Sequence, residues 1–238
     1  MEYFKYIDRV NIIGTHLNTM NSTMSADSTA LNQNSTAFAV PVFSLNTNTS
    51  SFSSGIGAYN SSAISGVETT LKGHGKDSQY GPEFLERVKQ IAQRINCDYK
   101  DLLAVMNSES GIRADAVNPN GGATGLIQFM PSTARSLGTT TAALRAMSPV
   151  EQLDYVEKYL VNCKKSAGIA NSKRLSAGDL YTLIFLPGRA NREVLTTAGE
   201  AYYNANKGAD TNHDGKITKS ELSARVASKH VNENTFLA

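Results

Sequence analysis

Residues 105–134 read VMNSESGIRADAVNPNGGATGLIQFMPSTA, and this stretch decides the fold and the candidate site. Its first residues continue an apolar helix face and place Glu109 one turn beyond that face, where the helix leaves the core. A carboxyl group there is partly desolvated but still faces solvent, which favours the neutral form that a general acid needs. Most glutamates at helix ends are solvated surface residues. The glycine-rich turn that follows is therefore the stronger signal.

That turn carries a family resemblance. Glu109-Ser110 precedes a short polar loop, and residues 118–131 then read NPNGGATGLIQFMP. This order resembles the signature of soluble lytic transglycosylases (the SLT family) of the goose-lysozyme-like superfamily, in which a Glu-Ser pair precedes Gly-Leu-(Met/Ile)-Gln-(Ile/Phe)-Met-Pro. The resemblance spans roughly residues 80 to 228 and implies a mainly α, lysozyme-like catalytic domain over 76–238.

The resemblance implies a role for each of five residues. Glu109 would be the sole general acid/base: it would protonate the bond between N-acetylmuramic acid and N-acetylglucosamine and then accept a proton from the muramyl C6 hydroxyl, giving a 1,6-anhydro product. Ser110 and Gln128 would hydrogen-bond the glycan. Phe129 and Met130 would offer apolar surface beside a sugar ring, with core packing as the alternative for both.

A second family element, usually Ala-Tyr-Asn-Ala-Gly, supplies a tyrosine that reaches toward the acid. Residues 201–206 read AYYNAN, which departs from that pattern at Tyr202 and Asn206. Tyr203 is the candidate for the substrate-binding tyrosine, and a buried structural tyrosine is the alternative. The glycines Gly121, Gly122 and Gly125 would let the backbone approach a polymer closely.

Two other functions stay open. A hydrolase on the same fold would add water to the product, and Asp115 or Asp179 could in principle supply the second carboxylate that hydrolysis commonly uses. A non-catalytic, calcium-dependent glycan-binding or structural module is the second alternative. The sequence places neither aspartate near Glu109.

Residues 210–221, DTNHDGKITKSE, fit the twelve-position loop of an EF-hand. Oxygen-bearing residues at the alternating positions can surround one calcium ion, and glycine stands at position six. Only one such loop is present, whereas calcium sensors usually pair two, so a structural clamp is expected. Phage and bacterial transglycosylase-like domains carry a similar loop. The expected ligands are the side chains of Asp210, Asn212 and Asp214, the carbonyl of Lys216, Thr218 directly or through water, and Glu221.

Several helices can be predicted from apolar spacing and end signals. One begins at Pro82 and buries the stripe Leu85, Val88, Ile91, Ala92 and Ile95. Asp98 would cap the helix that leads to Glu109. Ser148 with Glu151 and Thr218 with Glu221 have the spacing of capping boxes, and Ser176 with Asp179 gives a related start. Period-two strand patterns are scarce, so the domain should be mainly helical.

The first third of the chain has a different composition. Residues 1–17 have apolar spacing that could form a short amphipathic helix. Residues 18–75 are rich in Ser, Thr and Asn and predict a flexible, largely disordered linker. This N-terminal arm could tether the enzyme to a virion or an export machinery.

Bulk properties limit the remaining classes. The net charge of +2 over 238 residues suits an anionic polymer such as the cell wall and does not argue for nucleic acid. The start of the chain has no classical signal peptide and no stretch long enough to span a membrane. The two cysteines, Cys97 and Cys163, lack the spacing of a zinc site and are expected to be free thiols.

Overall fold

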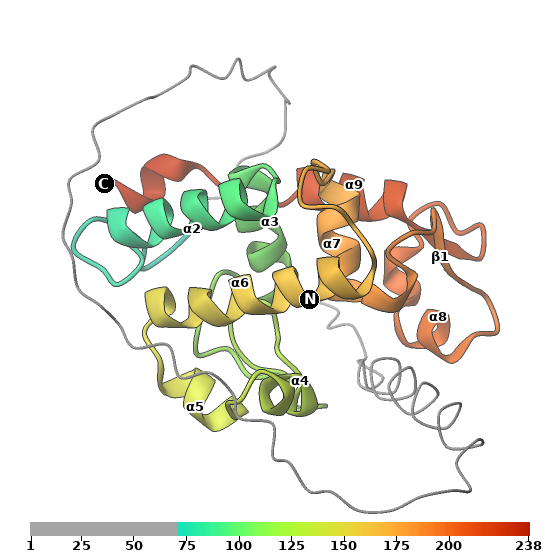
Figure 1. The fold of residues 1–238 in the computed structure, drawn as a ribbon, viewed down its shortest axis with the longest axis horizontal. Helices are drawn as coiled ribbons and strands as arrows, with labels where there is room; N and C mark the ends of the chain where they lie inside the picture. Colours follow the sequence, from blue (N-terminus) through green and yellow to red (C-terminus); the bar gives the residue numbers. More distant parts are fainter. Residues whose placement is uncertain (1–70) are drawn as a thin grey trace, which may run out of the picture.

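The computed structural model describes residues 71–238, which are mostly helical (Figure 1). The helices are α2 (Pro82–Ile95), α3 (Tyr99–Ser110), α4 (Pro131–Ser136), α5 (Thr141–Ala146), α6 (Pro149–Ser166), α7 (Ala177–Phe185), α8 (Ala201–Ala205) and α9 (Lys219–Ala227). Strands β1 (Val194–Thr197) and β2 (Lys216–Thr218) and the 3-10 turns η1 (Pro187–Arg189), η2 (Lys207–Ala209) and η3 (Glu233–Phe236) complete them. The helix expected over residues 1–17 and the linker up to residue 70 lie outside the described residues.

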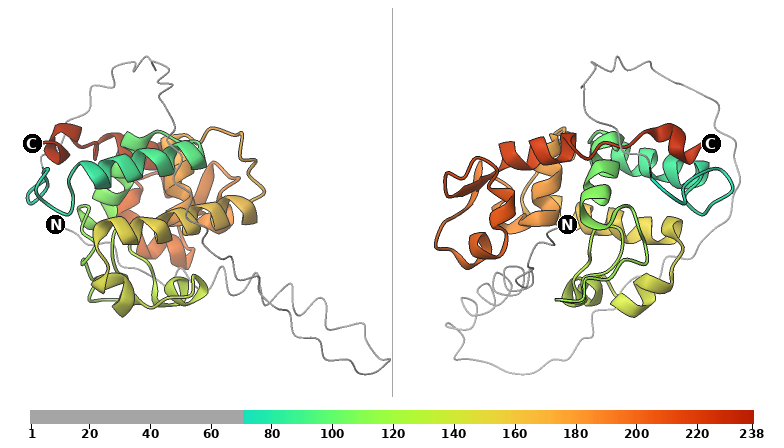
Figure 2. Two further views of the ribbon diagram at one scale, coloured as in Figure 1. Left: turned by 60° about the vertical axis from the view of Figure 1, so that its left-hand side comes forward. Right: turned by 180° about the vertical axis from the view of Figure 1, so that it is seen from behind.

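Helix α3 lies between two groups of elements. In Figure 1, α2 and α6 run across one side with α4 and α5 below them, and α7, α8, α9 and β1 form the other side. The view from behind in Figure 2 shows the same separation. Because α3 contacts α2, α7 and α9, the end of this helix is held from both sides.

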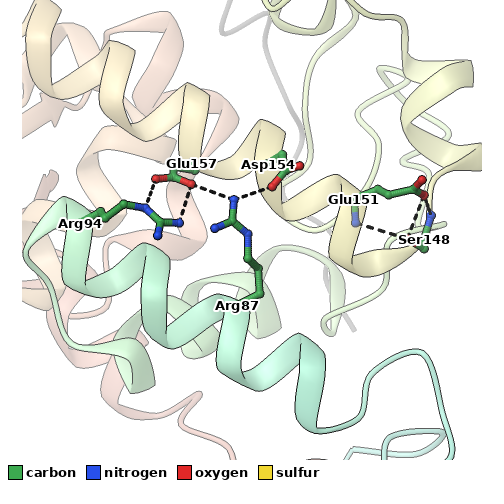
Figure 3. Close-up of polar contacts among 6 residues, drawn as sticks. All are labelled: Arg87, Arg94, Ser148, Glu151, Asp154 and Glu157. Carbon is green, nitrogen blue, oxygen red and sulfur yellow. Dashed lines mark hydrogen bonds and ion pairs between the residues drawn. The ribbon is translucent and has the colours of Figure 1, made fainter. Parts of the chain in front are cut away.

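The apolar stripe of α2 is buried as the sequence predicts, and α2 packs against α6. A network of charges joins the two helices across their solvent edge (Figure 3). Arg94 Nη2 donates to Glu157 Oε2 at 2.9 Å, and Arg87 Nη2 donates to the same oxygen at 3.1 Å. Arg87 also pairs with Asp154. The guanidinium of Arg94, followed by that of Arg87, lowers the pKa of the Glu157 carboxyl.

The predicted helix starts are confirmed. Ser148 and Glu151 form a complete capping box at α6, which Figure 3 also shows, and Thr218 and Glu221 form one at α9. Ser176 begins α7 with the same reciprocal contacts to Asp179. Each box satisfies backbone N–H groups that a helix start leaves unpaired.

Helices α7 and α9 approach each other very closely. A Cβ atom added to Gly178 would lie 2.5 Å from the carbonyl oxygen of Lys219 and 2.5 Å from Ser223 Oγ. Beside this crossing, Lys219 Nζ donates to Asp179 Oδ1 at 2.6 Å. The absence of a side chain at Gly178 is therefore what allows α9 to lie against α7.

The C-terminal segment closes back onto the start of the described chain. Lys76 N donates to the carbonyl of Ala238 at 3.0 Å. The ring of His74 packs against that of Tyr80 at a tilt of 43° and meets Phe236 edge-on. Residues 71–75, whose composition predicted a linker, are thus part of the packed unit.

Both cysteines are free and buried, as expected. Burial raises the pKa of Cys97 to about 12 and that of Cys163 to about 11. Thiols with such pKa values are poor nucleophiles near neutral pH.

Among residues 71–238, no helix combines the length and the apolar character needed to cross a membrane.

Candidate active site

Helix α3 ends at the acid that the sequence singles out. Its N-cap Asp98 accepts a hydrogen bond from Lys100 N, and five consecutive residues, 102–106, are buried. Gly111 ends the helix with a left-handed backbone (φ 67°), a conformation that glycine adopts without steric cost. Glu109 is half-buried at this end. The carboxyl thus sits where the helix passes from core to surface.

The turn after α3 is held by one buried amide. Gln152 of α6 is fully buried, and its Oε1 accepts a hydrogen bond from Leu126 N at 2.6 Å. Its Nε2 donates to the carbonyls of Ala114 and Leu144, both at 2.9 Å. Gln152 therefore ties together three backbone segments: it bonds to Leu126 N, to the Ala114 carbonyl, and to the Leu144 carbonyl, which also accepts from Met147 N.

Gly125 is required by this arrangement. Its φ is +82°, and a Cβ atom there would lie 2.3 Å from Gln152 Oε1. Both the left-handed backbone and the close approach of the amide exclude a larger residue. Gly125, which lies in the glycine-rich turn after Glu109, thus makes room for the amide of Gln152.

Ser110 links helix α3 to the turn. Its Oγ lies 3.0 Å from the carbonyl of Leu126 and 3.1 Å from that of Met106, and it accepts from Arg113 N at 3.1 Å. The hydroxyl is thus engaged by backbone groups. Its expected contact with the glycan remains a prediction.

Gln128 lies in the same turn with a left-handed backbone, φ 54°. Its Nε2 donates to the carbonyl of Gly125 at 3.1 Å and to that of Ala116 at 3.4 Å. Non-glycine residues in this conformation are uncommon and cluster at functional sites. The side chain is buried, so its amide supports the turn, and its contact with a sugar also remains a prediction.

Phe129 and Met130 lie in the core. They are 2% and 3% exposed, and the ring of Phe129 meets that of Tyr159 edge-on at 6.2 Å between centroids. Of the two alternatives that the sequence left open, this burial favours core packing. Because both side chains are buried, they present little surface to a ligand.

Tyr203 contacts the loop over 210–221. Its hydroxyl donates to Asp210 Oδ2 at 2.6 Å, so it joins α8 to the loop over 210–221. Asp210, by accepting this bond, raises the pKa of Tyr203. The adjacent Tyr202 donates to the carbonyl of Phe185 and packs against that ring.

The tyrosine beside Glu109 is Tyr181 of α7. Its hydroxyl lies 3.1 Å from Ser108 Oγ, and it is buried. Burial raises its pKa, and the negative charge of Glu109 raises it further. Arg225 of α9 completes the group, since its Nε donates to Ser108 Oγ at 2.8 Å. Sequence reasoning predicted helix α7 but missed the roles of Tyr181 and Arg225.

The two other acids considered for catalysis have other surroundings. Asp179 pairs with Lys219 and takes part in the start of α7. Asp115 is exposed and borders a cavity of about 700 Å³ formed by residues 72–74, Tyr80, residues 113–115 and the corner between α5 and α6. Glu109 does not line this cavity.

The loop over 210–221 folds around its own oxygen atoms. Asp210 Oδ1 and Asn212 Oδ1 both accept from Asp214 N, at 3.2 and 3.0 Å, so the two oxygens lie near one point. Glu221 Oε1 accepts from Thr211 N at 2.8 Å, which brings the last position of the loop back to its start. The bond from Tyr203 lowers the pKa of the Asp210 carboxyl.

Other oxygens of the loop have partners within it. Asp214 Oδ1 accepts from Lys216 N at 2.9 Å, and Thr218 Oγ1 donates to Glu221 Oε2 at 2.9 Å. Within residues 71–238, no three His, Cys, Asp or Glu side chains gather as a ready set of metal ligands. The three carboxylates of the expected ligand set, Asp210, Asp214 and Glu221, are therefore not gathered around one point in this structure. The residue types are those that calcium accepts, and the calcium site stays a prediction.

A mainly helical domain with Glu109 half-buried beside a glycine-containing turn fits a lysozyme-like domain. Residues 86–176 match the family model described as Transglycosylase SLT domain. The match supports the SLT family and indicates a transglycosylase-type enzyme that acts on peptidoglycan. It begins within α2, includes Glu109 and ends at the N-cap of α7. No solved structure matches the chain.

Proposed function

We propose that the protein is a peptidoglycan lytic transglycosylase with Glu109 as its sole general acid/base. The observation that carries the proposal is the position of Glu109: it is half-buried at the end of α3, beside the turn that Gln152 and Ser110 hold. This segment lies within residues 86–176, which match the SLT domain.

The reaction needs two proton transfers at the same carboxyl group. Protonated Glu109 gives its proton to the glycosidic oxygen as the bond to C1 of N-acetylmuramic acid breaks. The muramyl O6 then forms a bond to C1, and its proton returns to Glu109. The product is a 1,6-anhydromuramoyl end, and the carboxyl group is restored without water.

The surroundings of the other acids favour this route over hydrolysis. Asp179 is committed to Lys219, and Asp115 is exposed at the edge of a separate cavity. Retaining and inverting hydrolases commonly place a second carboxylate about 5 to 9.5 Å from the acid. The described contacts assign that role to neither aspartate.

The test is Glu109→Gln on purified cell-wall sacculi. Cleavage should fall by about 10²- to 10⁴-fold, the usual contribution of a general acid, while the melting temperature stays near that of the wild type. Asp115→Asn is the matched control and should keep full activity. Retained cleavage in Glu109→Gln would overturn the assignment.

Mass spectrometry of the wild-type products separates the two enzymatic alternatives. Anhydro-muropeptides support transglycosylation, whereas products heavier by one water support a hydrolase on the same fold. A wild-type protein that binds sacculi but releases no fragments would favour the non-catalytic module.

We further propose that residues 210–221 bind one calcium ion that clamps this part of the domain. The ligands would be the side chains of Asp210, Asn212, Asp214, Thr218 and Glu221 and the carbonyl of Lys216. Two observations support this proposal. The Asp210 and Asn212 oxygens both accept a hydrogen bond from Asp214 N, and Glu221, at the end of the loop, accepts one from Thr211 N near its start. When bound, calcium would hold the loop by electrostatic attraction and take no part in bond cleavage.

A further inference from the structure

Two contacts with α9 and the residues after it hold the last turn of α3, and their partners lie outside residues 86–176, the segment that matches the family model. Arg225 Nε donates to Ser108 Oγ at 2.8 Å, and Asn107 Nδ2 donates to the carbonyl of Lys229 at 3.0 Å. Arg225 lies on α9, and Lys229 follows it. Ser108 and Asn107 directly precede Glu109, so these contacts act on the backbone that carries the acid.

Tyr181, Glu109 and Arg225 also interact through their charges and hydrogen bonds. Tyr181 is buried against Ser108, and its pKa is raised first by burial and next by the charge of Glu109. The positive charge of Arg225, and its hydrogen bond with Tyr181, lower that pKa. A neutral phenol and a guanidinium therefore lie beside the catalytic carboxyl, with Ser108 hydrogen-bonded to both.

The fold fixes where Arg225 can lie. The capping box of Thr218 and Glu221 sets the first turn of α9, and Arg225 lies one turn after Glu221. The close crossing of α7 and α9 at Gly178 brings both helices against the end of α3. A change in the position of α9 would therefore move the guanidinium relative to Ser108.

We propose that Arg225 is a positioning residue for Glu109, acting through Ser108 and Tyr181. It does not touch the substrate in this assignment. It holds the end of α3 so that the carboxyl meets the glycosidic oxygen in the reactive geometry. The inference rests on the proposed function, since it concerns the same acid.

The test is a double-mutant cycle of Arg225→Ala and Ser108→Ala, measured on soluble glycan fragments. Misplacement of a catalytic group by about 1 Å can cost 10²-fold in rate. We expect kcat to fall by about 10- to 100-fold in each single variant, with KM nearly unchanged. Because the two residues share one contact, the double variant should be no slower than the slower single variant.

Two further variants control for general loss of structure. Asp179→Asn weakens the bond to Lys219 between α7 and α9 and should lower the melting temperature while leaving kcat unchanged. Arg225→Lys keeps a positive donor and should recover part of the lost kcat. Multiplicative losses in the cycle, or a wild-type kcat in Arg225→Ala, would overturn the proposal.

An activity-independent measurement separates this proposal from the proposed function. Amide hydrogen exchange at residues 107–111 reports local opening of the end of α3. Exchange there should be faster in Arg225→Ala than in Asp179→Asn. Equal exchange in the two variants would overturn the positioning role, whereas a wild-type protein that cleaves no glycan would overturn only the proposed function.

Discussion

The part of the domain from α2 to α6 and the part from α7 to the C-terminus are held together in different ways. In the first part, the turn beside Glu109 depends on buried neutral groups, chiefly Gln152. In the second part, the polar contacts involve charges: Lys219 with Asp179, Arg189 with Glu200, and the carboxylates of the loop over 210–221. The contrast teaches that one domain can hold the turn beside its candidate acid with buried neutral hydrogen bonds and hold the loop and helix crossing after α7 with charged groups.

The largest effect should come from the buried amide. Gln152→Leu removes partners from Leu126 N and from the carbonyls of Ala114 and Leu144. The Leu144 carbonyl keeps its bond from Met147 N, so the loss falls on Leu126 N and the Ala114 carbonyl. Each buried polar group left unpaired costs about 1–3 kcal/mol, so we expect a loss of about 2–6 kcal/mol in the free energy of unfolding. Urea denaturation measures it.

Gln90→Leu is the control for Gln152→Leu, because Gln90 is exposed on α2. Its effect should stay within about 0.5 kcal/mol, as for most surface substitutions. If both variants had the same stability, the first part of the domain would not depend on its buried polar bonds, and the contrast between the two parts would be lost.

The second-largest effect should come from removing calcium from the loop over 210–221. Chelation of calcium should lower the melting temperature of the wild type by about 5–10 °C if the ion is present at about 100 times its Kd, since a ligand that binds only the native state stabilises it. Asp210→Ala should abolish this response, whereas Asp77→Ala, at an exposed acid outside the loop, should keep it. An unchanged melting temperature on chelation would argue that the loop is only a polar turn.

The smallest effect should come from the ion pairs between α2 and α6. The Arg94 and Arg87 guanidiniums lower the pKa of Glu157, so this contribution to stability is present above the unfolded-state pKa and is lost as the pH falls through the folded-state pKa. Glu157→Gln should cost about 0.5–1 kcal/mol at neutral pH, typical of exposed ion-pair networks.

Denaturation at several pH values checks the sign of this prediction. The difference between Glu157→Gln and the wild type should shrink as the pH falls below about 4, the range in which a free glutamate is protonated. Glu83→Gln, at an exposed acid in the first turn of α2, serves as the control. A difference that grows at low pH would contradict the assigned pKa direction.

Local signals in the sequence predicted much of the fold. The capping boxes at Ser148 and Thr218, the buried stripe of α2 and the end of α3 at Glu109 depend on residues within a few positions of one another. Such short-range rules can be read directly from the chain.

The rest of the site depends on contacts between distant residues. Ser108 meets Tyr181 across 73 positions and Arg225 across 117. A tyrosine within the apolar helix α7 looks the same in sequence whether it faces an acid or only the core. Tyr203, chosen by its resemblance to a family motif, contacts Asp210, because α8 lies beside the loop.

The small sheet has a consequence for how the loop over 210–221 would respond to calcium. Strand β2 lies within this loop, and its Ile217 pairs with Thr196 of β1. Strand β1 is not part of a second EF-hand-like loop. Linked sites are needed for cooperative binding. Occupancy of this loop would therefore rise gradually with calcium concentration, without a threshold, which suits a lasting mechanical brace better than a signal-driven switch.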